Sequence, residues 1–141
     1  MKLQICKAHH IPGLPLPLFS HTVEAGFPSP AEGYLDETID LNQLLIAHPT
    51  ATFFVRVMGE SMNQAGILPG DVLVVDRSIE PQNRSIVLAV INAEFTVKRL
   101  LKKEKKLFLA PENSSFSPIE ITSETDFKIW GVITYVIHKA S

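Results

Sequence analysis

The chain of 141 residues has one cysteine, no apolar run as long as a membrane helix, and no excess of positive charge. A single cysteine excludes an internal disulfide and is compatible with a reducing compartment. A membrane helix needs about 20 consecutive apolar residues, and prolines at positions 12, 15 and 17 break the apolar N-terminal stretch. This stretch therefore lacks the continuous apolar segment of a secretory signal. We expect a cytoplasmic protein without a membrane segment.

The formal net charge is −2 at pH 7. A domain that binds DNA through its phosphates normally shows a clustered basic excess. One basic cluster, at residues 98–106, has six basic residues against one acid. We expect this segment to be a solvated turn that joins two strands. Its composition leaves open whether it also contacts DNA or a protein partner.

The N-terminal part of the chain differs from the rest. Residues 1–40 contain five of the ten prolines, together with scattered glycines, and predict an extended, flexible arm. Asp40 is a typical helix N-cap before the sequence LNQLLIAH, whose leucines recur at helical spacing, and Pro49 ends this short helix. We therefore expect an N-terminal arm over residues 1–40 and one folded domain over residues 41–141.

Beyond the short helix the pattern is that of strands. The expected strands are short β-branched or aromatic runs at 52–58, 72–76, 85–91, 94–101, 106–110 and 127–137. Turn signals separate them at 68–71, 92–93, 102–106 and 111–113. Short strands without intervening helices predict a mostly β fold, as a compact antiparallel-rich sheet or a partly closed barrel.

The segment Met-Gly-Glu-Ser-Met at 58–62 interrupts a strand pattern and places Ser61 after a turn that contains glycine. A serine in such a turn can project its hydroxyl, while the backbone N–H groups of Glu60 and Ser61 can form an oxyanion hole. Taken alone, the signal is weak, because most serines in this setting are ordinary turn residues. A nucleophilic serine also needs a base. The five histidines lie in the arm, at the end of the short helix and near the C-terminus, none in a segment typical of a catalytic loop.

Lys98 is the other candidate base, since it interrupts the apolar strand EFTVKRLL. A lysine can act as a base when desolvation leaves its amine neutral near the working pH. Strand alternation puts Thr96, Lys98 and Leu100 on one face, where the lysine stem could lie among apolar neighbours. From this strand alone, a surface lysine on a sheet face remains the simpler interpretation.

The serine motif and the lysine motif together indicate a function more specifically than either motif alone. Gly-Glu-Ser-Met at 59–62, Gly-Ile-Leu-Pro-Gly-Asp at 66–71 and Phe-Thr-Val-Lys-Arg at 95–99 together resemble the LexA and UmuD family of self-cleaving serine–lysine peptidases. The resemblance implies the fold of that family's C-terminal domain. It also implies that Ser61 is the nucleophile and Lys98 the general base, with neither a cofactor nor a metal ion.

The family cuts its own chain at an upstream Ala-Gly or Cys-Gly bond, and Ala25-Gly26 is such a bond here. Ala25 is small enough for a narrow pocket, and Gly26 lets the backbone approach the serine without a Cβ clash. The prolines that follow favour an extended chain. Without the downstream serine and lysine, the same dipeptide would be interpreted as a flexible joint.

The segments 25–31 and 39–46 resemble the UmuD branch of the family more than the LexA branch. That resemblance implies a role in the bacterial DNA-damage (SOS) response. It implies a homodimer, stimulation of cleavage by RecA filaments on single-stranded DNA, and a UmuC-like DNA polymerase subunit that joins the trimmed form in error-prone translesion synthesis. The 25 residues up to the cut are broken by prolines and cannot form a helix-turn-helix, so we expect no direct sequence-specific DNA binding.

Two other functions fit parts of the pattern. One is a peptidase that cuts other chains, as type I signal peptidases do with Ser–Lys chemistry, although the missing membrane segment argues against it. The other is a non-catalytic binding module in which Ser61 and Lys98 are structural. A metal site at Cys6, His9 and His10 is disfavoured because further ligands at suitable spacing are missing. The sequence leaves open whether cleavage occurs in cis or in trans.

Overall fold

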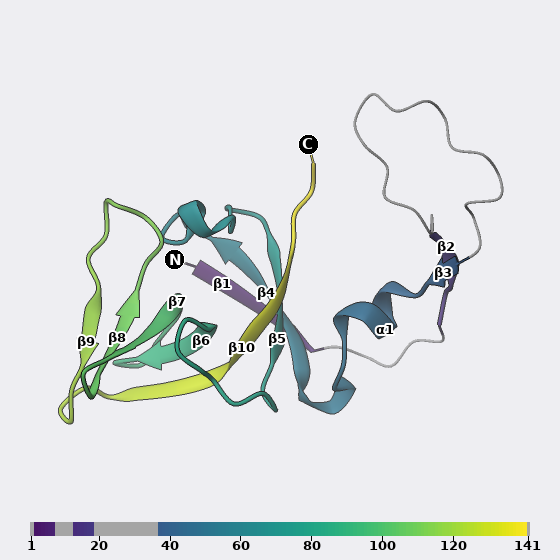
Figure 1. Ribbon diagram of the computed structural model, residues 1–141. Helices are drawn as coiled ribbons and strands as arrows, with labels where there is room; N and C mark the ends of the chain where they lie inside the picture. Colours follow the sequence, from purple (N-terminus) through teal and green to yellow (C-terminus); the bar gives the residue numbers. More distant parts are fainter. Residues whose placement is uncertain (1, 8–12, 19–36, 141) are drawn as a thin grey trace. The chain divides into compact units, whose positions relative to one another are not determined.

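The computed structural model of the chain describes residues 2–7, 13–18 and 37–140 (Figure 1). The chain divides into two compact units, one of residues Met1–His9 with His48–Ser141 and one of residues His10–Ala47. The larger unit is built on a single eight-stranded antiparallel sheet, which confirms the predicted mostly β fold class. Within the described residues, no helix is long and apolar enough to cross a membrane.

The eight strands lie in the order β1-β4-β5-β10-β6-β7-β8-β9, and every neighbouring pair is antiparallel. Their bounds are β1 (Lys2–Lys7), β4 (Thr52–Met58), β5 (Val72–Asp76), β6 (Ile86–Ile91), β7 (Glu94–Lys103), β8 (Lys106–Ala110), β9 (Ile119–Ile121) and β10 (Phe127–Ile137). Two 3-10 turns flank β4, at Pro49–Ala51 before it and at Asn63–Ala65 after it.

The smaller unit contains two short strands and one helix. Strands β2 (Leu16–Leu18) and β3 (Glu37–Ile39) pair as a separate two-stranded antiparallel sheet. Helix α1 (Leu41–Leu45) follows directly, and the Asp40 carboxylate accepts a hydrogen bond of 3.0 Å from the N–H of Asn42. Asp40 is therefore the N-cap that the sequence predicts.

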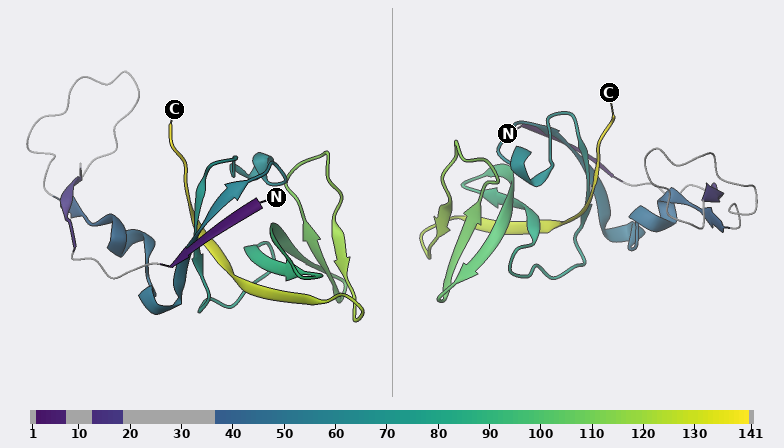
Figure 2. Two further views of the ribbon diagram at one scale, coloured as in Figure 1. Left: turned by 180° about the vertical axis from the view of Figure 1, so that it is seen from behind. Right: turned by 45° about the horizontal axis from the view of Figure 1, so that its top comes forward.

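The large sheet curls rather than lying flat, and β10, in yellow, follows this curl along its length (Figure 2). Its register shifts twice, between Ile129 and Gly131 against β6 and between Ile133 and Tyr135 against β5. At Gly131 a Cβ would lie 2.6 Å from the Val75 side chain, so glycine permits the close approach of β5. The curl brings β1 near β7, although these strands are not paired within the sheet.

Apolar side chains form a core on each face of the curled sheet. The first buries residues of β4, β5 and β6 together with Met62, Ile67 and Val97. The second buries Val87 and Ala89 of β6 and residues of β7, β8 and β10. Because successive side chains of a strand point to opposite faces, Leu88 belongs to the first core and its two neighbours to the second.

Tight turns connect the central hairpins. Asn92 and Ala93 between β6 and β7 have φ of 49° and 69°, and Glu104 and Lys105 between β7 and β8 have φ of 48° and 68°. Positive φ at both central residues is the type I′ geometry of two-residue hairpins. The basic cluster therefore includes the hairpin turn that was expected to join two strands.

Candidate active site

Ser61 lies in the bend that follows β4. The chain leaves β4 at Met58 and enters the 3-10 turn at Asn63. Met62 is fully buried in the first core, and Ser61 itself is only 5% exposed. The 3-10 turn ends at Gly66, whose φ of 82° is the left-handed conformation that glycine adopts without strain. Local turn geometry and one buried methionine thus fix the position of the serine.

Lys98 reaches the same place from β7. It stands opposite Val87 of β6 and is 8% exposed. Its Nζ donates hydrogen bonds to Ser61 Oγ at 3.1 Å, to Thr96 Oγ1 at 2.7 Å and to the Val97 carbonyl at 3.2 Å. The two side chains that the motif singles out, 37 residues apart in sequence, are therefore in direct contact.

Burial changes the acidity of this lysine. Desolvation penalises the charged form, and this lowers the pKa of Lys98 from its ordinary value. A neutral amine has a free lone pair, which can take the proton of a hydroxyl within hydrogen-bond reach. The contact between Nζ and Oγ satisfies this geometric requirement.

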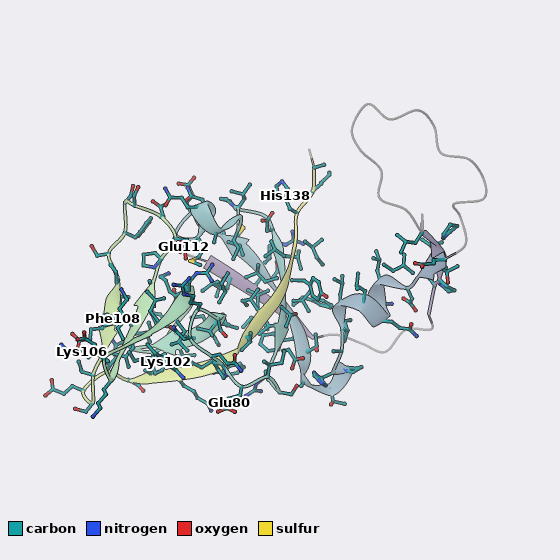
Figure 3. All side chains as sticks on the ribbon, in the orientation of Figure 1. Glu80, Lys102, Lys106, Phe108, Glu112 and His138 are labelled. Atoms are coloured by element: carbon teal, nitrogen blue, oxygen red, sulfur yellow. The ribbon has the colours of Figure 1, made fainter. Side chains whose placement is uncertain are left out.

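The segment after β8 holds the serine bend in place. Asn113 Nδ2 donates to the Glu60 carbonyl at 2.8 Å, and the Gln64 N–H donates to the Glu112 carbonyl at 2.8 Å. The Glu112 N–H points to Met62 Sδ at 3.2 Å. Glu112, labelled in Figure 3, also forms an ion pair with Arg99, the residue after Lys98. These contacts tie both catalytic candidates to one connecting segment, which the sequence predicts only as a turn.

The sequence predicts that the backbone N–H groups of Glu60 and Ser61 form the oxyanion hole. Within the described residues, no oxygen atom accepts a hydrogen bond from the N–H of Glu60 or of Ser61. The Glu60 carbonyl, in contrast, accepts from both Asn113 and the Asn63 N–H, the latter at 3.1 Å. Two hydrogen bonds thus fix the peptide that carries the Ser61 N–H.

Comparison with known proteins places this site in a family. The family model described as Peptidase S24-like matches residues 17–134, which is most of the chain. The chain belongs to the Peptidase S24-like family. This match confirms the resemblance to the LexA and UmuD family that the motifs indicate.

Three relatives illustrate the range of similarity. The S24-like chain is 50% identical over 124 residues to Protein ImpA of Salmonella typhimurium, covering 87% of this chain and 83% of ImpA. It is 45% identical over 121 residues to Protein MucA of Escherichia coli, covering 85% and 82%. It is 40% identical over 118 residues to the LexA repressor of Hahella chejuensis, covering 83% and 58%. The chain is thus a self-cleaving serine peptidase of the LexA and UmuD type.

The described histidines of this S24-like peptidase have other partners. His48 Nδ1 lies 2.6 Å from Asp76 Oδ2, and His138 Nδ1 lies 2.6 Å from Asp71 Oδ1 (His138 is labelled in Figure 3). Both aspartates are almost fully buried, whereas each histidine is about half exposed. Each of these histidines is paired with a carboxylate rather than with Ser61.

The predicted cleavage site and the histidines of the disfavoured metal site are not part of the active site described above. Ala25 and Gly26, the predicted cleavage site, lie outside the described residues, as do His9 and His10. Among the residues that the structure describes, no group of three or more His, Cys, Asp and Glu side chains is arranged to hold a metal ion.

Proposed function

We propose that this S24-like peptidase cuts its own Ala25–Gly26 bond, with Ser61 as the nucleophile and Lys98 as the general base. The observation that carries the proposal is the 3.1 Å contact between Lys98 Nζ and Ser61 Oγ, two side chains that are both almost fully buried. A hydroxyl and an amine in contact, with the amine pKa lowered by desolvation, form an activated nucleophile.

In the first half of the reaction, the neutral Lys98 amine takes the Ser61 proton while Oγ attacks the carbonyl carbon of Ala25. In this mechanism the N–H groups of Glu60 and Ser61 stabilise the oxyanion that forms. The Lys98 ammonium then gives its proton to the Gly26 nitrogen as the peptide C–N bond breaks. This leaves an acyl ester on Ser61 and a free amine on Gly26.

In the second half, water takes the place of the leaving amine. Lys98, again neutral, takes a proton from water, and the resulting hydroxide attacks the ester carbonyl. As the ester C–O bond breaks, the Lys98 ammonium returns this proton to Ser61 Oγ, so Ser61 regains its hydroxyl and Lys98 is neutral again. The carboxylic acid formed at Ala25 ionises in water, and the net change is hydrolysis of one peptide bond. When the bond that is cut lies on the same polypeptide as Ser61 and Lys98, tethering supplies proximity without a separate binding step.

The biological role that we propose is the one implied by the UmuD branch. Self-cleavage is stimulated by RecA filaments on single-stranded DNA, and the trimmed homodimer serves a UmuC-like polymerase subunit in translesion synthesis in the cytoplasm. The support is the resemblance of segments 25–31 and 39–46 to that branch, together with 40% identity to a LexA repressor.

Mass spectrometry of the purified protein at mildly alkaline pH tests the cleavage chemistry. We expect a new fragment that begins at Gly26, and its absence in both Ser61→Ala and Lys98→Ala. General-base catalysis typically contributes about 10²–10⁴-fold to a rate, and the losses in the two variants should not add because the pair acts as a unit. Lys102→Ala, which removes an exposed lysine from the same strand, is the matched control and should cleave normally.

The same assay with RecA, nucleotide and single-stranded DNA tests the proposed stimulation. Faster release of the Gly26 fragment is expected when all three are present. Clear cleavage in Ser61→Ala would refute the assignment of the nucleophile. A product cut at another bond would refute the assignment of the site.

A further inference from the structure

Strand β1 covers the free edge of β4. Its register pairs Gln4 with Arg56 and Cys6 with Phe54, and β1 is the last strand on this side of the sheet (Figure 1). The Val57 N–H and carbonyl both bond toward the β5 side, to Asp71 and Gly70. In an antiparallel strand the backbone groups of successive residues point to opposite sides. Those of Phe54 and Arg56 therefore point to β1.

Apolar contacts also hold β1 in place. Leu3 stands opposite Val57 and packs against the first core, and Ile5 stands opposite Val55. Ile5 also borders a surface hollow of about 430 Å³ whose lining includes Phe53. Gln4, between the two apolar residues, is exposed, and Ile5 keeps 41% of its surface exposed. Among the described side chains of β1, Leu3 and Ile5 thus add apolar contacts at alternate positions to the backbone ladder.

The covalent connection of β1 runs through the proposed cleavage site. Residues 1–25 precede that bond, and β4 begins at Thr52. A cut after Ala25 would leave β1 without a covalent link, held by its ladder with β4, its approach to β7 and the packing of Leu3. Once the bond is cut, this strand of six residues is held by non-covalent contacts alone and can leave with its fragment. An uncovered edge also presents unpaired N–H and C=O groups, which are a template for another strand.

We infer that β1 is a releasable cover, and that the edge of β4 it leaves behind binds an extended segment of a partner protein. The segment has apolar side chains two residues apart, in the places of Leu3 and Ile5. The β4 backbone supplies the affinity and the two apolar positions the selectivity, as in other strand-addition interfaces. This inference rests on the proposed self-cleavage, since the cut is what frees β1. The edge ends three residues before Ser61, so the interface borders the active site.

A first experiment tests the cover in the whole chain, without cleavage. Amide hydrogen exchange is measured by NMR in a Ser61→Ala background, with Leu3→Asp compared with Gln4→Asp. Leu3→Asp should speed exchange of the Phe54 and Arg56 amides by about tenfold or more, while Val55 and Val57, which bond on the β5 side, should be unchanged.

Gln4→Asp, at an exposed position of the same strand, is the control and should leave all four amides unchanged. Because Val55 and Val57 report on β4 itself, they separate release of β1 from general unfolding. Equal protection of Phe54 and Arg56 in Leu3→Asp and in its control would refute the cover.

A second experiment tests the released edge. The protein is allowed to cleave itself, and the N-terminal fragment is separated by size under native conditions. Exchange at Phe54 and Arg56 should then increase by a similar factor. A synthetic peptide of residues 1–8, added in large molar excess as the probe for a partner segment, should restore protection, and the same peptide with Leu3→Asp should not.

The outcomes separate this inference from the proposed function. A fragment that stays bound through the separation, or amides that stay protected after it leaves, would overturn the releasable cover while self-cleavage stands. Failure of the probe peptide to restore protection would overturn the binding edge. A chain that does not cleave at all would refute the proposed function, and the first experiment would still decide whether β1 covers β4.

Discussion

Lys98 combines two properties at the scale of a single residue. Its Nζ contacts three oxygen acceptors, including the serine hydroxyl, and its burial lowers its pKa. Three acceptors favour the charged ammonium, which has three N–H donors, but desolvation opposes it more strongly. Lys98 therefore loses its proton at a lower pH than an ordinary lysine, whose pKa is about 10.4.

The first prediction is that self-cleavage without RecA rises with pH. The base form of Lys98 accumulates as pH passes the lowered folded-state pKa, so the rate should increase through that value and level off below the ordinary lysine range. Stability should begin to rise near the same folded-state value and continue to rise up to the ordinary lysine pKa. Between the folded and unfolded pKa values the unfolded chain binds the extra proton, so the free energy of unfolding increases with pH. Rate–pH profiles with circular dichroism at each pH measure both. A flat rate profile in an intact fold would contradict Lys98 as the base.

Asn113 is a residue that the sequence alone could not connect with the site. Its Nδ2 bonds to the carbonyl of Glu60, which is 53 residues away, and its Oδ1 accepts from the Ser115 N–H at 2.9 Å. A Pro-Glu-Asn turn is visible in the sequence, but long-range contacts of a turn carry no local signal. The serine and lysine could be predicted because they sit in specific motifs. The segment that fixes the serine bend could not.

The second prediction concerns the donor of Asn113. Asn113→Asp keeps the oxygen that accepts from Ser115 and loses the group that donates to Glu60. Self-cleavage should slow by about fivefold, since a hydrogen bond contributes about 1 kcal/mol and about 1.4 kcal/mol corresponds to tenfold in rate. Ser114→Ala, at the exposed neighbouring position, is the control. The rate at which the fragment beginning at Gly26 is released is measured for wild type, Asn113→Asp and the control. Equal rates in Asn113→Asp and wild type would show that the bend holds without this contact.

At the scale of elements, β5 is fastened at both ends by histidine–aspartate pairs. Asp71 directly precedes the strand and bonds to His138, which directly follows β10; Asp76 ends the strand and bonds to His48. Burial alone would raise the pKa of Asp76, but hydrogen bonds from His48 and Ser78 outweigh it and lower that pKa. The two pairs hold β5, the strand against which the register of β10 shifts between Ile133 and Tyr135 and which Gly131 approaches closely.

The third prediction is acid sensitivity that depends on Asp76. Since the folded-state pKa of this carboxyl is lowered, its contribution to stability is present above the unfolded value of about 3.9 and is lost as pH falls through the folded value. Asp76→Asn should cost about 1–3 kcal/mol at neutral pH and flatten the acid limb of stability. Urea titrations from neutral to acidic pH measure this effect, with the exposed Asp126→Asn as control. An unchanged acid limb in Asp76→Asn would assign the acid sensitivity to other groups.

Elements with a strong local pattern were predictable from the sequence. Strands β4, β5, β8 and β10 have the predicted bounds, and β6 and β7 differ only at one end. Strands β2, β3 and β9 were not predicted, because three residues are too few to show a period of two. Strand β1 lies in the stretch that its proline content assigns to the arm. The alternation of Leu3 and Ile5 with polar residues was the available signal, and proline-rich neighbours hid it.

At the scale of the whole molecule, the proposed cut removes little core material. Among the described residues before the cut, Leu3 packs against the first core, and the described buried residues of both cores lie between Phe53 and Val132. The cut chain should therefore keep its fold and lose only the edge contact of β1. What changes is the accessible surface, so we expect cleavage to act as a switch of partners and not as a step in degradation.

The last prediction tests this switch against the proposed polymerase partner. Primer extension past a lesion is measured with RecA filaments, the UmuC-like subunit and either the self-cleaved protein or the uncleavable Ser61→Ala chain. Bypass should be far greater with the cleaved form, because in this proposal only that form leaves the β4 edge free. Thermal melting of both forms is the control, and the midpoints should differ by only a few degrees, since about 1 kcal/mol shifts a domain of this size by roughly 2–8 °C. Equal bypass by both forms would leave self-cleavage standing and remove the switch. A cleaved form that melts far earlier would show instead that the N-terminal segment is a structural part of the domain.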